Sequence, residues 1–191
     1  MDKAHDVTDR ADIGHTPRIS RLVVTGEDDR GRSCVTTDGD IPAWVQRPNG
    51  LLVMDAWTEE NIPVANVAEL PRRDDAQLVP PTSGVCVRIA VFPPDDQVDE
   101  EALSAYEAQA ATLYGSGNDD ARGGMHRTDT VDVVTVISGE IWALLDAEEV
   151  LLRQGDVLVQ RATRHAWSNR STAPCTVVTT MIPADRSPSL R

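Results

Sequence analysis

Short apolar runs separated by turn residues fill the last third of the chain, from residue 126 to residue 181. If residues 126–136 form one continuous strand, its even-numbered side chains share one face, because successive side chains of a strand point to opposite sides. That face is polar at its start and apolar toward its end, as in a strand that borders a cavity and then a packed core. Short strands at this spacing are typical of an all-β barrel or sandwich. Further strands are predicted at residues 141–145, 150–152, 157–160, 165–169 and 176–181.

The first half of the chain predicts fewer strands and one helix. A helix is expected from Asp99 to Tyr114, because Asp99 can cap it and apolar residues recur along one face. The strands are too few to close a core of their own, so we expect them to join the same two sheets as residues 126–181. They are predicted at residues 19–24, 33–37, 51–57 and 85–92, the first two as a two-stranded ribbon.

Two connecting segments are candidates for covers over a site. Residues 58–83 are rich in proline, acids and amides, and residues 115–125 form a glycine-rich tract between the helix and the strand at residue 126. A lid is one interpretation of each segment, and a plain connector is the other.

The length and composition favour one domain. A chain of 191 residues, 40% of them hydrophobic, suits a single domain with a sizeable core. Residues 1–17 are polar and lack periodicity, so we expect a mobile leader that carries His5 and His15. Residues 18–186 are expected to form a single domain, with a barrel that bears the motifs at 123–183.

The charge of the chain argues against two classes of partner. A net charge of -13 and a pI near 4.6 disfavour nucleic acid and anionic membranes, because both are bound by concentrated basic surfaces. No run is long enough to cross a membrane, and the first residues lack the apolar part of a secretory signal, so a cytoplasmic protein is expected. Cys34, Cys86 and Cys175 are expected to be reduced thiols in the core.

The side chains that could act in catalysis or metal binding lie between Gly123 and Asn169, where His126, Asp132 and His165 occur among the apolar strands. This segment resembles the two motifs of the cupins, which read G-x5-H-x-H-x3,4-E-x6-G and G-x5-P-x-G-x2-H-x3-N. Its amino-acid sequence is similar to that of stand-alone bacterial and fungal cupins, many of them tied to secondary metabolism. The resemblance implies that residues 18–186 form a single cupin-like domain, an all-β, cupin-like double-sheet jelly-roll barrel with an N-terminal strand extension and one helix before the site strand.

The match to these motifs is partial. Thr128 stands where the second histidine is usual, and Asp132 stands where the glutamate is usual. Arg161 and Thr163 replace the proline and glycine of the second motif. The positions that correspond to the motifs are His126, Thr128, Asp132, Gly139, Gly155, His165 and Asn169.

Three roles stay open for His126, Asp132 and His165. Two imidazoles and one carboxylate form the ligand set of a facial triad, suited to a divalent metal such as Fe, Mn, Ni or Zn. Without a metal, a buried histidine beside a carboxylate is poised near neutrality as a general acid or base. The third interpretation is purely structural.

The metal hypothesis requires a bend in the chain. Along a straight strand, His126 and Asp132 are six residues and roughly 20 Å apart, at about 3.3 Å per residue. Two ligands of one ion cannot be so distant, so the bend must fall at residues 128–130. We expect the imidazoles of His126 and His165 within about 5 Å of each other and Asp132 nearby. If Asp132 points away, the metal-free acid/base role is preferred.

Acid/base chemistry on a small molecule is the favoured function. The enzyme is expected to be a lyase, isomerase or cyclase that dehydrates, decarboxylates or cyclises a polyketide-like or aromatic secondary metabolite. The alternatives are an Fe(II)-dependent dioxygenase and a non-catalytic ligand-binding cupin. Stand-alone cupins are commonly dimers, so a homodimer is expected. Candidates for substrate binding are Thr128, Thr130, Gln160, Arg161 and Trp167.

Overall fold

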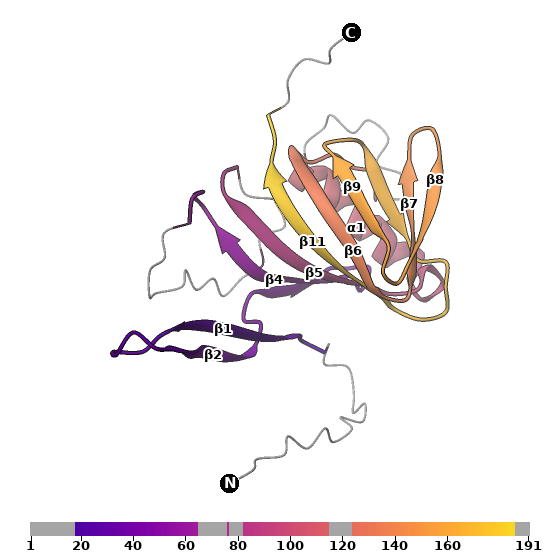
Figure 1. Ribbon diagram of the computed structural model, residues 1–191. Coiled ribbons are helices and arrows are strands. Elements are labelled where there is room, and N and C mark those ends of the chain that lie inside the picture. Colours follow the sequence, from indigo (N-terminus) through magenta and orange to yellow (C-terminus); the bar gives the residue numbers. More distant parts are fainter. Residues whose placement is uncertain (1–17, 65–75, 77–81, 115–123, 186–191) are drawn as a thin grey trace.

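The chain forms two facing β-sheets, a separate two-stranded ribbon and one long helix (Figure 1). The computed structural model describes residues 18–64, 76, 82–114 and 124–185. The predicted leader and most of the two predicted covers lie outside the described residues. The predicted all-β jelly-roll architecture is confirmed.

Antiparallel pairing builds both sheets. Most strands begin and end within a few residues of the predicted bounds, but the short strand β3 was not predicted. The six-stranded sheet has the order β3 (Trp44–Gln46), β4 (Leu52–Glu59), β5 (Val85–Phe92), β11 (Cys175–Pro183), β6 (Thr130–Ser138) and β9 (Val157–Arg161). The three-stranded sheet has the order β10 (His165–Ser168), β7 (Glu140–Leu145) and β8 (Glu149–Arg153).

The predicted ribbon is present, but it does not join either sheet, so the prediction that all early strands enter the two sheets is wrong. Strands β1 (Arg21–Glu27) and β2 (Ser33–Asp40) pair only with each other among the described strands (Figure 1). Strand β2 ends at Asp40, and Pro42, which has no N–H to offer to a strand ladder, follows before the chain enters the large sheet at β3. The ribbon instead packs Leu22 near a small second core formed by Ile41, Leu52 and Met54.

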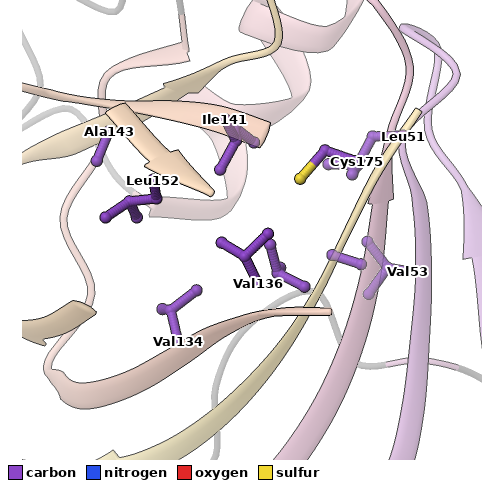
Figure 2. Close-up of a cluster of buried hydrophobic side chains, with 10 residues drawn as sticks. Leu51, Val53, Val134, Val136, Ile141, Ala143, Leu152 and Cys175 are labelled. Atoms are coloured by element: carbon purple, nitrogen blue, oxygen red, sulfur yellow. The ribbon is translucent and has the colours of Figure 1, made fainter. Parts of the chain in front are cut away.

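The main core lies between the two sheets. Figure 2 shows Val134 and Val136 from the large sheet opposite Ile141, Ala143 and Leu152 from the small sheet. Every second residue of β6 from Thr130 to Val136 is buried, as the alternating pattern predicted. At about 25 cal/mol per Å² of buried apolar surface, this interface supplies the main driving force for folding.

Helix α1 (Glu100–Tyr114) has the predicted bounds to within one residue. The backbone N–H of Ala102 donates to Asp99 Oδ1 at 2.7 Å, which confirms Asp99 as the N-cap. A single 3-10 turn, η1 (Asp95–Gln97), precedes it. In the part of the chain that the structure describes, no helix is long and apolar enough to cross a membrane.

All three cysteines are free thiols, as predicted. Cys86 and Cys175 are buried, and burial raises the pKa of each thiol to about 11, so neither is a nucleophile near neutral pH. Cys34 is only partly buried because it belongs to the thin β1–β2 ribbon, so its predicted place in the core is wrong.

The homodimer remains a prediction, and the outer face of β9 is where we expect it to form. Val157 and Val159 on this edge strand are 57% and 55% exposed, and Ile137 of the adjacent strand β6 is 47% exposed. Exposed apolar side chains on an edge strand favour pairing with another copy. We expect the wild-type chain to sediment as a dimer at micromolar concentration and Val159→Glu to sediment as a monomer.

A ribbon variant provides the control for this prediction. Val35 is as exposed as Val157, at 57%, but lies on β2. Val35→Glu should therefore leave the dimer intact. A wild-type monomer at micromolar concentration contradicts the prediction.

Candidate functional site

A cavity of about 90 Å³ opens between the two sheets. Five of the eight predicted site residues line it: His126, Thr128, Asp132, His165 and Trp167. The other residues that line it are Arg47, Leu51, Val53, Arg88, Ala90, Phe92, Tyr106, Val134, Val177, Thr179 and Met181. The cavity therefore combines an apolar and aromatic wall with a few polar side chains, which is typical of a small-molecule site.

The two histidines are neighbours because their backbones pair. His126 N–H donates to the carbonyl of His165, and His165 N–H donates to the carbonyl of His126, both at 2.9 Å. Residues paired in this way project their side chains to the same side. The imidazole centroids are 4.5 Å apart, within the expected distance of about 5 Å.

The chain changes sheets between His126 and Thr130. His126 extends the small sheet through its bridge to β10, whereas β6 begins at Thr130 in the large sheet. The predicted continuous strand is therefore broken, with a bend at Asp129, inside the segment where a bend was expected. His126 and Asp132 consequently reach the cavity from different sheets.

Hydrogen bonds to backbone carbonyls fix the tautomer of both imidazoles. His126 Nδ1 lies 2.8 Å from the carbonyl of Gly124, and His165 Nδ1 lies 3.0 Å from the carbonyl of Thr163. A carbonyl oxygen only accepts, so each Nδ1 carries the proton. In the neutral form of each ring, Nε2 then holds the lone pair that can accept a proton.

Burial keeps both imidazoles neutral at physiological pH. Desolvation lowers the pKa of His126 to about 3, assisted by the neighbouring His165 and by the positive charge of Arg47. Desolvation also lowers the pKa of His165. Trp167 packs edge-on against His165, with ring centroids 5.8 Å apart, and contributes to this apolar surrounding.

The pKa of Asp132 is shifted in the opposite direction to that of the histidines. Burial raises the pKa of this carboxyl group, and a hydrogen bond from Thr130 and the charge of Arg88 only partly oppose the shift. Its Oδ1 atom is buried and has no hydrogen-bond partner among the described residues. A raised carboxyl pKa and lowered imidazole pKa values reduce the free energy needed to move a proton between the two kinds of group.

The other three predicted residues do not line the cavity. Arg161 is exposed because it follows the buried Gln160 on β9 and strand side chains alternate, so the structure does not bring it to the cavity where substrate binding was predicted. Thr130 is buried and hydrogen-bonded to Thr128 at 2.9 Å. Gln160 is buried and donates from Nε2 to the carbonyl and to the hydroxyl of Thr163. Thr130 and Gln160 thus support residues of the cavity rather than line it.

Gln160 supports the site through one shared acceptor. The carbonyl of Thr163 accepts from Gln160 Nε2 at 2.9 Å and from His165 Nδ1 at 3.0 Å. This pairing holds the carbonyl that sets the tautomer of His165. Hydrogen bonds from outside the site orient histidines in the same way in metal and acid/base sites.

Asn169, which corresponds to the last position of the second motif, has a structural role. Its Nδ2 donates to the carbonyls of Phe92 and Ala173, and its Oδ1 accepts from the N–H and hydroxyl of Ser171. The side chain is 1% exposed. It therefore ties the turn before β11 to the end of β5.

Sequence reasoning missed Arg47, Arg88 and Tyr106, which also line the cavity. Arg88 lies at an inward position of β5, and its Nε donates to Asp55 Oδ1 at 2.7 Å. The guanidinium of Arg47 lies over the ring of Tyr106, 4.3 Å from the centroid. The available signal was an arginine at an inward-facing position of an apolar strand, as in VCVRIAVF.

The predicted three-ligand metal set of His126, Asp132 and His165 does not fit this arrangement. Among the described residues, no group of three or more His, Cys, Asp or Glu side chains could hold a metal ion. The physical reason is the change of sheet between His126 and Thr130, which leaves the histidine pair as two adjacent ligands and puts the carboxylate on the other sheet.

Comparisons with known proteins find short, clear matches. No protein-family model matches the chain. The phomopsin biosynthesis cluster protein D of Diaporthe leptostromiformis is 52% identical over 48 residues, which are 25% of each protein. The cupin-domain-containing oxidoreductase virC of Hypocrea virens is 50% identical over 46 residues, 24% of each protein. The chain thus matches about a quarter of the length of these curated relatives.

A solved structure gives a weaker likeness. A cupin 2 conserved barrel domain protein from Salinispora arenicola superposes with a TM-score of 0.40 at 12% identity, covering 71% of this chain and 78% of the other.

We expect the fold to lose stability as the pH falls from about 6.5 to 5. The pKa of His126 is about 3 in the folded chain against 6.5 for an unperturbed imidazole, so the unfolded chain binds the proton first. The free energy of unfolding then falls by up to about 1.4 kcal/mol per pH unit for each such histidine. Asp132 acts in the opposite direction, because its raised pKa lets the folded chain bind a proton first. Urea unfolding at pH 7 and pH 5.5 measures the net effect.

His126→Gln isolates the contribution of this histidine. The variant keeps a side chain that can donate to the Gly124 carbonyl but cannot titrate. Its stability should depend less steeply on pH than that of the wild type. Equal pH dependence in the two proteins shows that His126 titrates normally.

Proposed function

We propose that this chain is a cupin and that its barrel cavity is the active site of a small-molecule enzyme that works by acid/base chemistry. The observation that carries the proposal is the pair of neutral imidazoles, each with its proton fixed on Nδ1, in the same cavity as a buried carboxyl group with a raised pKa. A lyase, isomerase or cyclase needs such a set of groups.

In the proposed step, His165 acts as the base and Asp132 as the acid. His165 Nε2 removes a proton from a carbon next to a carbonyl group, and the electrons of that C–H bond form a C=C bond. Asp132, in its protonated form, gives its proton to a hydroxyl on the adjacent carbon, which leaves as water. Proton transfer from the imidazolium to the carboxylate then restores both groups.

His126 and Trp167 have supporting roles in this proposal. His126 lies beside His165, with ring centroids 4.5 Å apart, and adds to the burial that disfavours the charged form of His165, so the proton that His165 takes up is readily released again. Trp167 and Phe92, with ring centroids 6.1 Å apart, supply flat apolar surfaces of the cavity. These surfaces suit an aromatic or polyketide-like substrate, and relatives that carry the names of fungal biosynthesis clusters support a place in secondary metabolism.

Proton exchange tests the proposal without knowledge of the natural substrate. Small keto acids such as phenylpyruvate are incubated with the chain in D₂O, and loss of the α-proton signal is followed by NMR. His165→Ala should lower the exchange rate at least about 100-fold, the usual contribution of a general base. Its unfolding should stay cooperative, because the His126–His165 bridge is made by backbone atoms.

Two further variants make this test specific. Asp132→Asn should retain exchange, because Asp132 acts only on the leaving hydroxyl. Arg161→Ala, on the exposed side of β9, should behave as the wild type. A His165→Ala chain that exchanges protons as fast as the wild type and is merely less stable overturns the acid/base proposal.

An iron-dependent oxidoreductase is the second candidate, and two observations favour it. Relatives are named cupin-domain-containing oxidoreductases. Both histidines donate Nδ1–H to backbone carbonyls, which is usual for metal-binding histidines. Because the described residues offer only two adjacent ligands, we expect less than one equivalent of iron, manganese, nickel or zinc by elemental analysis, and proton exchange that survives EDTA. One equivalent of metal that is lost in His165→Ala favours the oxidoreductase instead.

A further inference from the structure

Arg47 is held at the end of strand β3 by a tight turn. Its N–H donates to the carbonyl of Leu51 at 2.8 Å, and its carbonyl accepts from Gly50 N–H at 2.9 Å. Pro48 suits the second position of such a turn, and Gly50 has a φ of +80°, which favours glycine. Val45, two residues earlier, packs against the main core, so Arg47 lies on the inward face of the strand.

Helix α1 holds the guanidinium group in place. Arg47 Nε donates to Gln109 Oε1 at 2.9 Å, and the guanidinium stacks over Tyr106. Both partners are uncharged. The side chain lines the cavity and the residue is 5% exposed, yet its Nη2 atom has no hydrogen-bond partner among the described residues. A buried cation with an unpaired hydrogen-bond donor lowers the stability of the fold unless a ligand accepts that hydrogen bond.

Arg88, the other arginine that lines the cavity, can be compared with Arg47 in the same structure. The side chain of Arg88 is 11% exposed, and it forms an ion pair with Asp55, with Nε to Oδ1 at 2.7 Å and Nη2 to Oδ2 at 3.2 Å. The fold thus neutralises one cavity arginine with its own carboxylate and leaves the other with a neutral amide. This difference points to a negative charge that Arg47 receives from outside the chain.

The polar groups of the cavity divide into two sets. Arg47 is close enough to influence His126, whereas Arg88 is close enough to influence Asp132. Asp132 Oδ1, also buried without a partner, can accept a hydrogen bond from a hydroxyl group. The aromatic rings of Phe92 and Trp167 line the same cavity. A ligand that satisfies both sets has an anionic oxygen, an apolar body and a hydroxyl group.

We propose that Arg47 binds the carboxylate of a small hydroxy acid and so positions the acid over the histidine pair. A carboxylate suits the site better than a phosphate group, because one open guanidinium nitrogen matches one carboxylate oxygen, whereas phosphate is usually held by several donors. This inference rests on the proposed function for its location, since the same cavity is used. It adds the substrate class, a small hydroxy acid, and a specificity-determining residue.

Matched acids and amides test the inference by binding alone. The probes are 3-hydroxybenzoate and its neutral counterpart 3-hydroxybenzamide, titrated into the full chain by calorimetry and by tryptophan fluorescence. The wild type should bind the acid at least about tenfold more tightly than the amide, which corresponds to one charge-assisted hydrogen bond. In Arg47→Met this ratio should fall to about one, while Arg161→Met, on the exposed face of β9, should keep the wild-type ratio.

Arg47→Lys keeps the test decisive if the methionine variant does not fold. This variant preserves the charge but cannot reproduce the planar guanidinium, so the acid should bind more weakly while the preference for acid over amide persists. An unchanged acid-to-amide ratio in Arg47→Met overturns the inference. So does a wild-type chain that binds neither probe, or one from which inorganic phosphate displaces the acid at equal concentration.

The two proposals fail in different experiments. Binding is measured without turnover, so loss of the acid preference in Arg47→Met supports the carboxylate site even if no proton exchange is found. Exchange that depends on His165 but not on Arg47, with no preference for acids, supports the acid/base function and overturns the carboxylate site.

Discussion

Two backbone hydrogen bonds between His126 and His165 determine the geometry of the site and how the chain enters the barrel. They attach the segment before β6 to the small sheet, and four residues later the chain belongs to the large sheet. This crossing puts the imidazoles on one sheet and the carboxyl of Asp132 on the other, with the cavity between them. Because main-chain atoms make the bridge, the site can change its side chains without losing its frame.

Much of the fold was predictable because it depends on alternation. The strands in the last third, strand β5 and the capped helix were all predicted within a few residues, since each is marked by a periodic apolar pattern, a turn or a capping residue. The ribbon was predicted, but its separation from the two sheets was not. Alternation and the charged turn between β1 and β2 indicate that these two strands pair, but neither shows whether the pair joins a larger sheet.

The site was predictable in part for the same reason. Parity and motif spacing pointed to His126, Thr128, Asp132, His165 and Trp167, all of which line the cavity. Arg161 was misplaced because a one-residue step on β9 turns a side chain to the other face. Arg47, Arg88 and Tyr106 come from parts of the chain far from the histidines, and only tertiary packing brings them to the cavity. Spacing within one segment carries no information about such contacts.

The first half of strand β4 and the residue before it are buried on both faces, with Leu51 to Met54 between 0% and 5% exposed. One face borders the main core, and the other borders the small core beneath the ribbon. The ribbon is consequently part of the cooperative unit rather than an appendage of it. A barrel without β1 and β2 would open Ile41, Leu52 and Met54 to water, and the strand that supports Arg47 through its turn would lose the cover on its outer side.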